Sequence, residues 1–425
     1  MLTKKVMTLE LSRENQFSDG YLYRSLELPA QEHEIRDALQ QLRQRSADIS
    51  PDQIAIYNSR YIPQLEDKRF DSPTIDELNF FAKRLAAMDE NDMAIMQALC
   101  SRYIKDDDEL VSIKDLINMT YGLDSVSVLS NVTNDEQLAD FVIENEMQDD
   151  VASVPESARY LLDKAKIGKL QREMDGGVYS GKLYVCTDHF EMPKVYDGKT
   201  LPESTHEPWF AFKLQVAQAP QSDEPFAEPT EWITLPMTEE AMKEVAKRLN
   251  ASSLKELVYY EFESSVPQIT TDDFTQMLDI EKLNALAFTM AEMSPDEQIT
   301  FKAALEAERK HGINLDDILN ISNNLHRYEM NTNCEGASDF FKQYLLTHMD
   351  TKFDDRWLDP LVYRREGSRL LEKLGATVTD YGIISSAGGS LYKLVSYDSD
   401  ETATEDEVPD EDEDIGEDEG MVMSL

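Results

Sequence analysis

Cysteine, basic residues and long apolar runs are all scarce in this sequence of 425 residues. Its three cysteines, Cys100, Cys186 and Cys334, form an odd and widely spaced set, which predicts reduced thiols rather than a disulfide framework. No apolar run approaches the ~18 residues of a membrane helix, and the first residues lack the apolar core of a signal peptide. We therefore expect a soluble, cytoplasmic protein.

Catalytic motifs are also scarce. The sequence has no phosphate-binding glycine loop, Walker pattern or nucleophile elbow. Cys186 and His189 have the spacing of half a zinc site, but no second ligand pair follows at zinc spacing. Asp107 with Asp149 or Asp150 could hold Mg²⁺ for a hydrolase, yet such sites need a basic groove for substrate phosphates. Because that groove is missing, the sequence predicts no enzyme, metal or cofactor.

Acidic residues dominate what is present. There are 84 aspartates and glutamates against 41 lysines and arginines, a net charge of −43. Fourteen acids lie between Asp398 and Glu419, so the rest of the chain carries about −29, spread over both halves. Such a field repels nucleic acid and attracts basic partners. Because duplex DNA carries one charge per ~1.7 Å of axis, this excess corresponds to roughly 50 Å of duplex.

The sequence also repeats itself, at a separation that falls from 207 to 199 residues. Periodicity predicts strands over 21–28 and 53–57 and helices over 31–42, 72–88, 91–101, 136–144 and 158–174. The first copy's landmarks are Leu28-Pro29, Ile62-Pro63-Gln64-Leu65, Ile75-x-x-Leu78-Asn79, Asp115-Leu116-Ile117-Asn118-Met119-Thr120 and Gly168. The second copy's are Leu235-Pro236, Val266-Pro267-Gln268-Ile269, Ile280-x-x-Leu283-Asn284, Asp317-Ile318-Leu319-Asn320-Ile321-Ser322 and Gly367.

The second copy closes with the segment from Phe353 to Ile384. A helix is predicted from Tyr363 to Leu374, with Gly375 as its C-terminal cap, then a strand over Ala376–Thr379. The residues Tyr363-x3-Gly367, Gly375 and Thr379-Asp380-Tyr381-Gly382-Ile383-Ile384 resemble the C-terminal antirestriction segment of the ArdA-type antirestriction proteins. The first copy departs from it, with Val154-Pro155 in place of Trp357-Leu358-Asp359-Pro360 and Tyr179-Ser180-Gly181-Lys182 in place of the Thr-Asp-Tyr-Gly turn.

Members of that family are acidic DNA mimics, encoded on mobile elements, that bind restriction-modification enzymes in place of DNA. The internal repeat predicts a tandem duplication, and the resemblance implies an α+β fold in which each elongated unit has a small α+β subdomain, a helical middle and a second small α+β subdomain. We expect a first unit over 1–188, a linker over 189–208, a second unit over 209–395 and a disordered acidic tail over 396–425.

Under this hypothesis carboxylates stand in for DNA phosphates. The bases Arg356, Arg364, Arg365, Arg369 and Lys373 are interpreted as structural partners of nearby acids. The candidate phosphate mimics are Asp106, Asp107, Asp108, Glu109, Asp135, Glu136, Asp149, Asp150, Asp272, Asp273, Asp316, Asp317, Asp354 and Asp355. The candidate motif and interface residues are Trp357, Asp359, Tyr363, Gly367, Gly375, Asp380, Tyr381 and Gly382.

The expected partner is a DNA-binding restriction-modification enzyme, a type I complex in the first instance, or another DNA-targeting defence enzyme. The alternative is an acidic scaffold or chaperone that binds basic proteins through the tail and the acidic faces. No direct binding to nucleic acid or membrane is expected. The family's units resemble twofold dimers, so we expect an intrachain pseudo-dimer, monomeric in solution, with the segment ending at Cys186 near that ending at Ile384.

Overall fold

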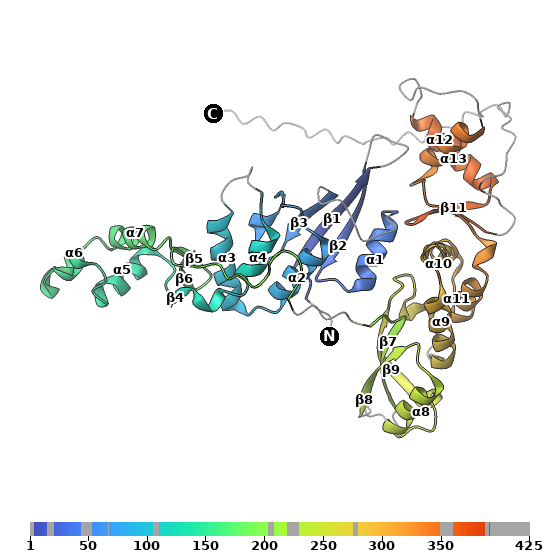
Figure 1. The fold of residues 1–425 in the computed structure, drawn as a ribbon, viewed down its shortest axis with the longest axis horizontal. Coiled ribbons are helices and arrows are strands. Elements are labelled where there is room, and N and C mark those ends of the chain that lie inside the picture. The colour runs from blue at the N-terminus through green and yellow to red at the C-terminus, as the bar shows by residue number, and fades with distance from the viewer. Residues whose placement is uncertain are drawn as a thin grey trace, which may run out of the picture. The chain divides into compact units, whose positions relative to one another are not determined.

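The protein is α+β, as the sequence predicts: in a computed structural model its helices are mixed with small antiparallel sheets (Figure 1). The structure describes residues 4–14, 21–43, 53–66, 68–104, 110–202, 208–218, 229–274, 279–348, 360–386 and 391. The expected acidic tail therefore lies outside the described residues. Within them, no helix combines the length and apolarity needed to cross a membrane.

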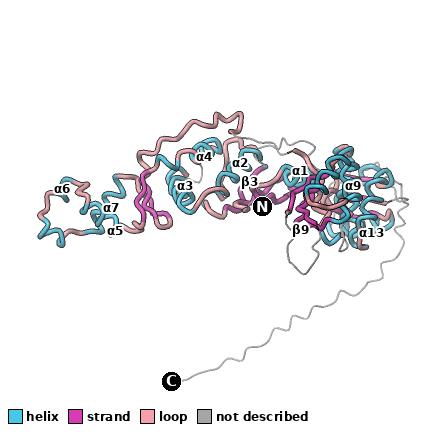
Figure 2. Tube along the Cα trace, turned by 90° about the horizontal axis from the view of Figure 1, so that it is seen from below, coloured by secondary structure: helices cyan, strands magenta, loops and turns pink. Residues whose placement is uncertain are grey.

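The first half begins with a three-stranded sheet of order β2-β1-β3, continues with three helices and ends with a second sheet of order β4-β6-β5. Figure 2 shows the helices α3 and α4 between these two groups of strands. The elements are β1 (Met7–Glu14), β2 (Tyr21–Leu28), α1 (Glu32–Gln41), β3 (Ile54–Ser59), α2 (Ile75–Ala86), α3 (Glu90–Tyr103), α4 (Ile113–Met119), β4 (Ser127–Ser130), α5 (Asp135–Glu144), α6 (Asp149–Ala152), α7 (Lys164–Met174), β5 (Val178–Ser180) and β6 (Leu183–Cys186).

The second half follows the same plan, with sheet orders β8-β7-β9 and β10-β12-β11 around three helices. Its elements are β7 (Phe212–Gln218), β8 (Thr230–Leu235), α8 (Glu239–Arg248), β9 (Leu257–Ser264), α9 (Ile280–Glu292), α10 (Pro295–Glu308), α11 (Leu315–Asn323), β10 (Glu329–Asn331), α12 (Ala337–His348), α13 (Pro360–Lys373), β11 (Ala376–Thr379) and β12 (Gly382–Ser385).

The repetition extends to an irregularity in the first sheet of each half. The pairing of β1 with β3 shifts register at Leu9, which leaves Tyr57 as an extra residue in β3. The pairing of β7 with β9 shifts at Val216 and leaves Tyr260 as the extra residue. Val6 and Ala211 are equivalent positions, because their N–H groups bond to the carbonyls of Leu28 and Leu235. The second bulge therefore lies two residues further along its central strand than the first.

A buried asparagine joins sheet to helix identically in both halves. The Asn79 side chain accepts the Ala30 N–H at 2.7 Å and donates to the Ala30 carbonyl at 2.8 Å. Asn284 makes the same pair of hydrogen bonds to Met237, at 2.9 and 3.0 Å. Each amide thereby satisfies both backbone groups that follow the strand, which buried polar groups require. The asparagine of the repeated Ile-x-x-Leu-Asn pattern thus has the same structural role in both halves.

Part of the expected linker packs on the first half. Tyr196 is 3% exposed, and its hydroxyl donates to the Glu77 carboxylate at 2.9 Å. The Asn118 side chain accepts the N–H groups of Val195 and Tyr196 and donates to the Tyr196 carbonyl. Residues 195 and 196 of the expected linker are therefore held against α2 and α4 by hydrogen bonds.

Candidate functional site

One strongly acidic stretch lies on α5 and α6 of the first half. Residues 135–152 hold seven carboxylates and no lysine or arginine. Asp135 and Glu136 stand in the first turn of α5, and Asp149 and Asp150 open α6. The positive end of a helix dipole favours carboxylates at these positions. The local fold therefore tolerates this concentration of negative charge.

Three of the seven carboxylates are engaged by bases. Arg172 Nε donates to Asp135 Oδ1 at 2.8 Å, and the Tyr179 hydroxyl donates to the same oxygen at 2.8 Å. The hydrogen bond from Arg172 holds the pKa of Asp135 below its usual value. Asp135, a candidate phosphate mimic, thus serves the fold by tying α5 to α7. The other two ion pairs are Lys164 with Asp140 and Arg159 with Glu146.

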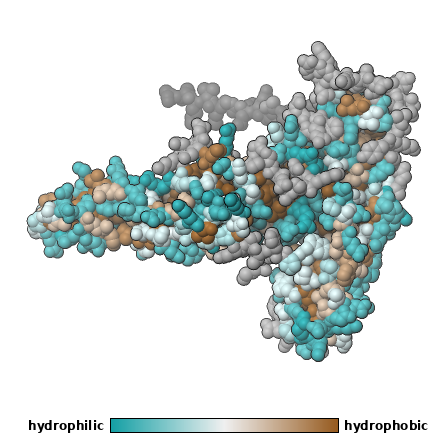
Figure 3. Space-filling view, viewed as in Figure 1, coloured by the Kyte–Doolittle hydropathy of each residue, from teal (hydrophilic) through white to brown (hydrophobic). Residues whose placement is uncertain are grey.

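The remaining four carboxylates are Glu136, Glu144, Asp149 and Asp150. All four are exposed, and the part of the chain that the structure describes gives none of them an ion pair. Figure 3 shows hydrophilic residues over most of the visible surface of α5 to α7, with only small apolar patches between them. We define these four residues as the α5–α6 carboxylates; they are the exposed charges of this stretch that no base among the described residues neutralises.

The candidate carboxylates of the second half differ in availability. Asp273 is 6% exposed; it accepts the Thr270 N–H at 2.7 Å and pairs with Arg309 at 3.0 Å, so it serves the fold. Asp272 is exposed. Asp316 pairs with Lys282 at 2.6 Å on the surface, and Asp317 accepts the Asn314 N–H in the capping box of α11. The remaining candidates, Asp106, Asp107, Asp108, Glu109, Asp354 and Asp355, lie outside the described residues.

The closing motif of the second half builds a close helix pair. A Cβ added at Gly367 would lie 2.0 Å from the Ala337 carbonyl oxygen, so only glycine lets α13 approach α12 this closely. Gly168 has the same relation to Asp135 in the first half, at 1.8 Å. Tyr363 is buried beside Phe341, with ring centroids 5.8 Å apart. These motif residues act in packing; Trp357 and Asp359 lie outside the described residues.

The turn that follows is shaped by two glycines. Gly375 has φ +60, the left-handed conformation expected of a helix cap. Gly382 has φ +135, and a Cβ there would lie 2.5 Å from the Asn331 carbonyl oxygen. Between them, Asp380 is exposed and its N–H donates to the Glu306 carboxylate at 3.0 Å. Arg24 and Arg43 of the first half both donate to the Asp380 carbonyl.

The junction of the two halves contains a buried charge pair. Lys302 Nζ lies 2.6 Å from Asp37 Oδ1 and donates to Gln40 Oε1 at 2.7 Å. The Tyr381 hydroxyl donates to Asp37 Oδ1 at 2.7 Å and accepts a hydrogen bond from Gln268. Burial lowers the pKa of Lys302. Asp37 and Lys302 were not among the residues singled out in the sequence; a lysine between the apolar Phe301 and Ala303 is the signal that could have found one of them.

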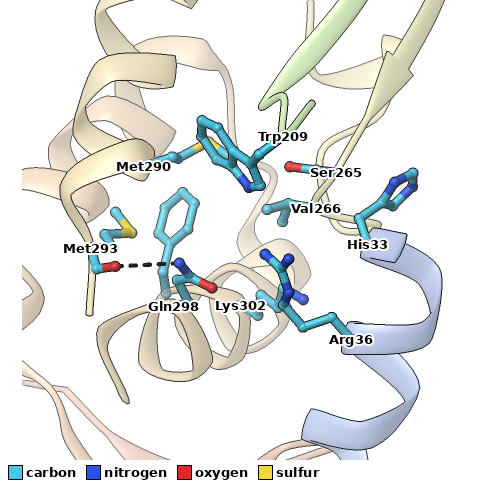
Figure 4. Close-up of a pocket in the computed structure, with 10 residues that line it drawn as sticks. His33, Arg36, Trp209, Ser265, Val266, Met290, Met293, Gln298 and Lys302 are labelled. Atoms are coloured by element: carbon cyan, nitrogen blue, oxygen red, sulfur yellow. Dashed lines mark hydrogen bonds between the residues drawn. The ribbon is translucent and has the colours of Figure 1, made fainter. Parts of the chain in front are cut away.

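The cavity beside this pair is small. Figure 4 shows His33 and Arg36 of α1 opposite Trp209, Met290 and Met293 of the second half. Its volume of about 30 Å³ is roughly the space of one water molecule. A small-molecule substrate does not fit such a space.

The second half differs at the position equivalent to Asp37. That residue of α8 is Glu244, which pairs with Arg248 of its own helix and has a side chain that is 78% exposed. The expected pseudo-twofold arrangement of the two halves stays a prediction.

The cationic surface of α13 is partly neutralised from within the helix. Arg365 Nε lies 3.0 Å from Glu366 Oε1, and Arg369 Nη1 lies 3.3 Å from the same oxygen. This agrees with the interpretation of these bases as partners of nearby acids. Arg364 is exposed and lines the same shallow surface, while Arg356 lies outside the described residues.

The cysteines are poorly placed for nucleophilic chemistry. Burial raises the pKa of Cys100 and of Cys334 to about 12, and burial followed by the charge of Asp175 raises that of Cys186 to about 11. In the described ranges, no three histidine, cysteine, aspartate or glutamate side chains are grouped as metal ligands.

Comparison with the models of known protein families gives no match for this chain, and comparison with curated proteins gives none either.

Proposed function

We propose that this protein is a DNA mimic that inhibits restriction-modification enzymes, type I complexes in the first instance, by occupying their DNA-binding groove. The observation that carries the proposal is the set of α5–α6 carboxylates: four exposed acids that form no ion pair with the described residues, in a stretch of seven acids and no base. The resemblance of the closing segment to the ArdA-type antirestriction proteins supports the same function.

The mechanism is competitive and electrostatic. A DNA-binding groove holds lysines and arginines that neutralise phosphates, and phosphate contacts supply much of the affinity for DNA. Carboxylates held on helices can occupy the same cations, with the advantage that folding has already fixed their positions. The net charge of −43 adds long-range attraction, which raises the rate of encounter with a basic groove. The protein would act in the cytoplasm, where such enzymes meet DNA.

The proposal predicts that position matters as well as total charge. The quadruple variant E136Q/E144Q/D149N/D150N removes four negative charges from the α5–α6 carboxylates. A matched control, D76N/E90Q/D124N/E191Q, removes four charges from other exposed positions, three in the same half and one, Glu191, in the expected linker. The two variants have equal net charges. A difference in inhibition between them therefore depends on where the charges were removed and not on how many.

The assay is DNA binding by a purified type I restriction-modification enzyme in the presence of each variant. We expect the α5–α6 variant to inhibit at least about tenfold less well than the parent, because each lost phosphate-like contact weakens binding. The control should lose much less. Equal losses would favour the alternative of an acidic scaffold that acts through total charge, and no loss in either variant would contradict the proposal.

A further inference from the structure

The open face of the β2-β1-β3 sheet carries three exposed tyrosines. The other face is buried against the core through residues such as Leu9, Leu26 and Ile56. On the open face, Tyr21 is 53%, Tyr23 51% and Tyr57 66% exposed. Tyr21 and Tyr23 are neighbours on the edge strand β2, with ring centroids 6.2 Å apart. Large aromatic side chains this exposed leave apolar surface in water.

Carboxylates lie among these tyrosines on the same face. The register of β1 with β2 places Glu14 opposite Tyr21, and residues two apart on a strand share a face, which adds Glu10. Glu27 lies on the same face of β2, two residues beyond Ser25. Glu14 and Glu27 are exposed, and Glu10 is half-buried.

The two arginines of these strands do not lie on the open face. Arg13 donates to the Leu42 and Arg43 carbonyls beside α1, and Arg24 donates to the carbonyl of Asp380. In the described parts of β1, β2 and β3, the alternation therefore leaves the open face with tyrosines and glutamates and without lysine or arginine.

The fold itself does not require the tyrosine pair. Tyrosine has a high strand propensity, yet the β8-β7-β9 sheet has the same topology with Thr230 at the position of Tyr23. The equivalent face of that sheet carries the exposed Trp232, and it places Lys213 opposite Glu263. The pair of neighbouring exposed tyrosines, among glutamates and without a lysine on the strands, is a property of the first sheet.

We propose that this open face is a docking surface for an arginine-bearing basic surface of a partner protein. Carboxylates bind guanidinium groups through charge-assisted hydrogen bonds, and a tyrosine ring accepts the same cation over its face. Tyrosine also supplies rigid contact area of the kind that dominates binding hot spots. This inference rests on the proposed function and adds to it: the tyrosines give the complex a component that salt does not screen.

The experiment uses the full chain and a purified type I methyltransferase complex as the probe, with affinity measured at low and high salt. The triple variant Y21S/Y23S/Y57S removes the rings, Y21F/Y23F/Y57F keeps them, and E10Q/E14Q/E27Q removes the charges. The control W232S/F288S/L346S removes three exposed apolar side chains from the second half. Thermal unfolding followed by circular dichroism checks that each variant is folded.

We expect the serine variant to lose about a hundredfold in affinity at both salt concentrations. The phenylalanine variant and the control should remain within a few-fold of the parent, and the glutamine variant should lose affinity mainly at low salt. If the parent chain and the serine variant bind the complex equally well, this inference is wrong but the proposed function is not. A parent chain that fails to bind the complex would overturn the proposed function and this inference with it.

Discussion

Lys302 Nζ and Asp37 Oδ1 lie 2.6 Å apart, with both side chains less than a tenth exposed, although 265 residues separate them in sequence. A surface pair in the same protein, Lys282 and Asp316, has the same 2.6 Å separation but is about half exposed or more. The two ion pairs therefore have the same separation between nitrogen and oxygen but differ in how deeply they are buried.

This contrast predicts different costs for the same substitution. Lys302→Met leaves Asp37 buried without its cation, which should cost about 3–5 kcal/mol. Lys282→Met should cost less than about 1 kcal/mol, because water screens the exposed pair. Urea unfolding measures both. The double variant K302M/D37L should recover most of the lost free energy of unfolding. If Lys302→Met destabilised the protein no more than Lys282→Met does, Lys302 and Asp37 would not form a buried ion pair.

The two close helix crossings give a second prediction. Glycine to alanine in a helix normally gains up to about 1 kcal/mol, but Gly168→Ala and Gly367→Ala push a methyl group against a carbonyl oxygen. Each should therefore destabilise by about 1–3 kcal/mol or more. Gly336→Ala is the control, since nothing lies within 4 Å of its added Cβ. Thermal unfolding measures the stability of all three variants. If Gly168→Ala and Gly367→Ala left the stability unchanged, the helices would not cross as closely as the structure shows.

Asp135 gives a prediction for pH. Its pKa is lowered by the hydrogen bond from Arg172, so the folded state favours the charged form. Because the pKa of Asp135 is lower in the folded state than in the unfolded state, its ionisation stabilises the fold. This stabilisation is fully present above the unfolded-state pKa, near 3.8, and is lost as the pH falls through the folded-state pKa. Asp135→Asn should cost about 1–2 kcal/mol at neutral pH.

The difference between parent and Asp135→Asn should shrink when urea unfolding is repeated below about pH 4. Asp272→Asn, at an exposed position, is the control and should show little difference at either pH. A gap between parent and Asp135→Asn that persists or widens in acid would show that the Arg172 contact does not act through charge.

Sequence reasoning located the elements whose patterns are local. The strand at Tyr21–Leu28, the helix before Gly375 and the repeated Leu-Pro and Leu-Asn landmarks all follow from periodicity, caps and short spacing. The sequence does not predict the strand Met7–Glu14, because its five polar residues mask the alternation of Met7, Leu9 and Leu11 in this central strand of the sheet.

What sequence could not supply were the long-range relations. Nothing near Asp37 in the chain indicates that its partner is Lys302, and nothing near Asp135 indicates that Arg172 and Tyr179 engage it. A run of acids is visible in sequence, but whether each acid faces solvent or serves the fold depends on side chains brought in from elsewhere. That distinction separates Asp149 and Asp150 from Asp135 and Asp273.

The most direct test of DNA mimicry is displacement of labelled duplex DNA from a purified type I methyltransferase complex, followed by fluorescence anisotropy as this protein is added. Mimicry predicts that the anisotropy falls to that of free DNA, that excess unlabelled DNA reverses the effect, and that rising salt weakens the protein's binding steeply. The protein alone should leave the anisotropy of free DNA unchanged. An anisotropy that stays high or rises while the protein binds the complex would show that both ligands bind at once, and would contradict occupation of the DNA groove.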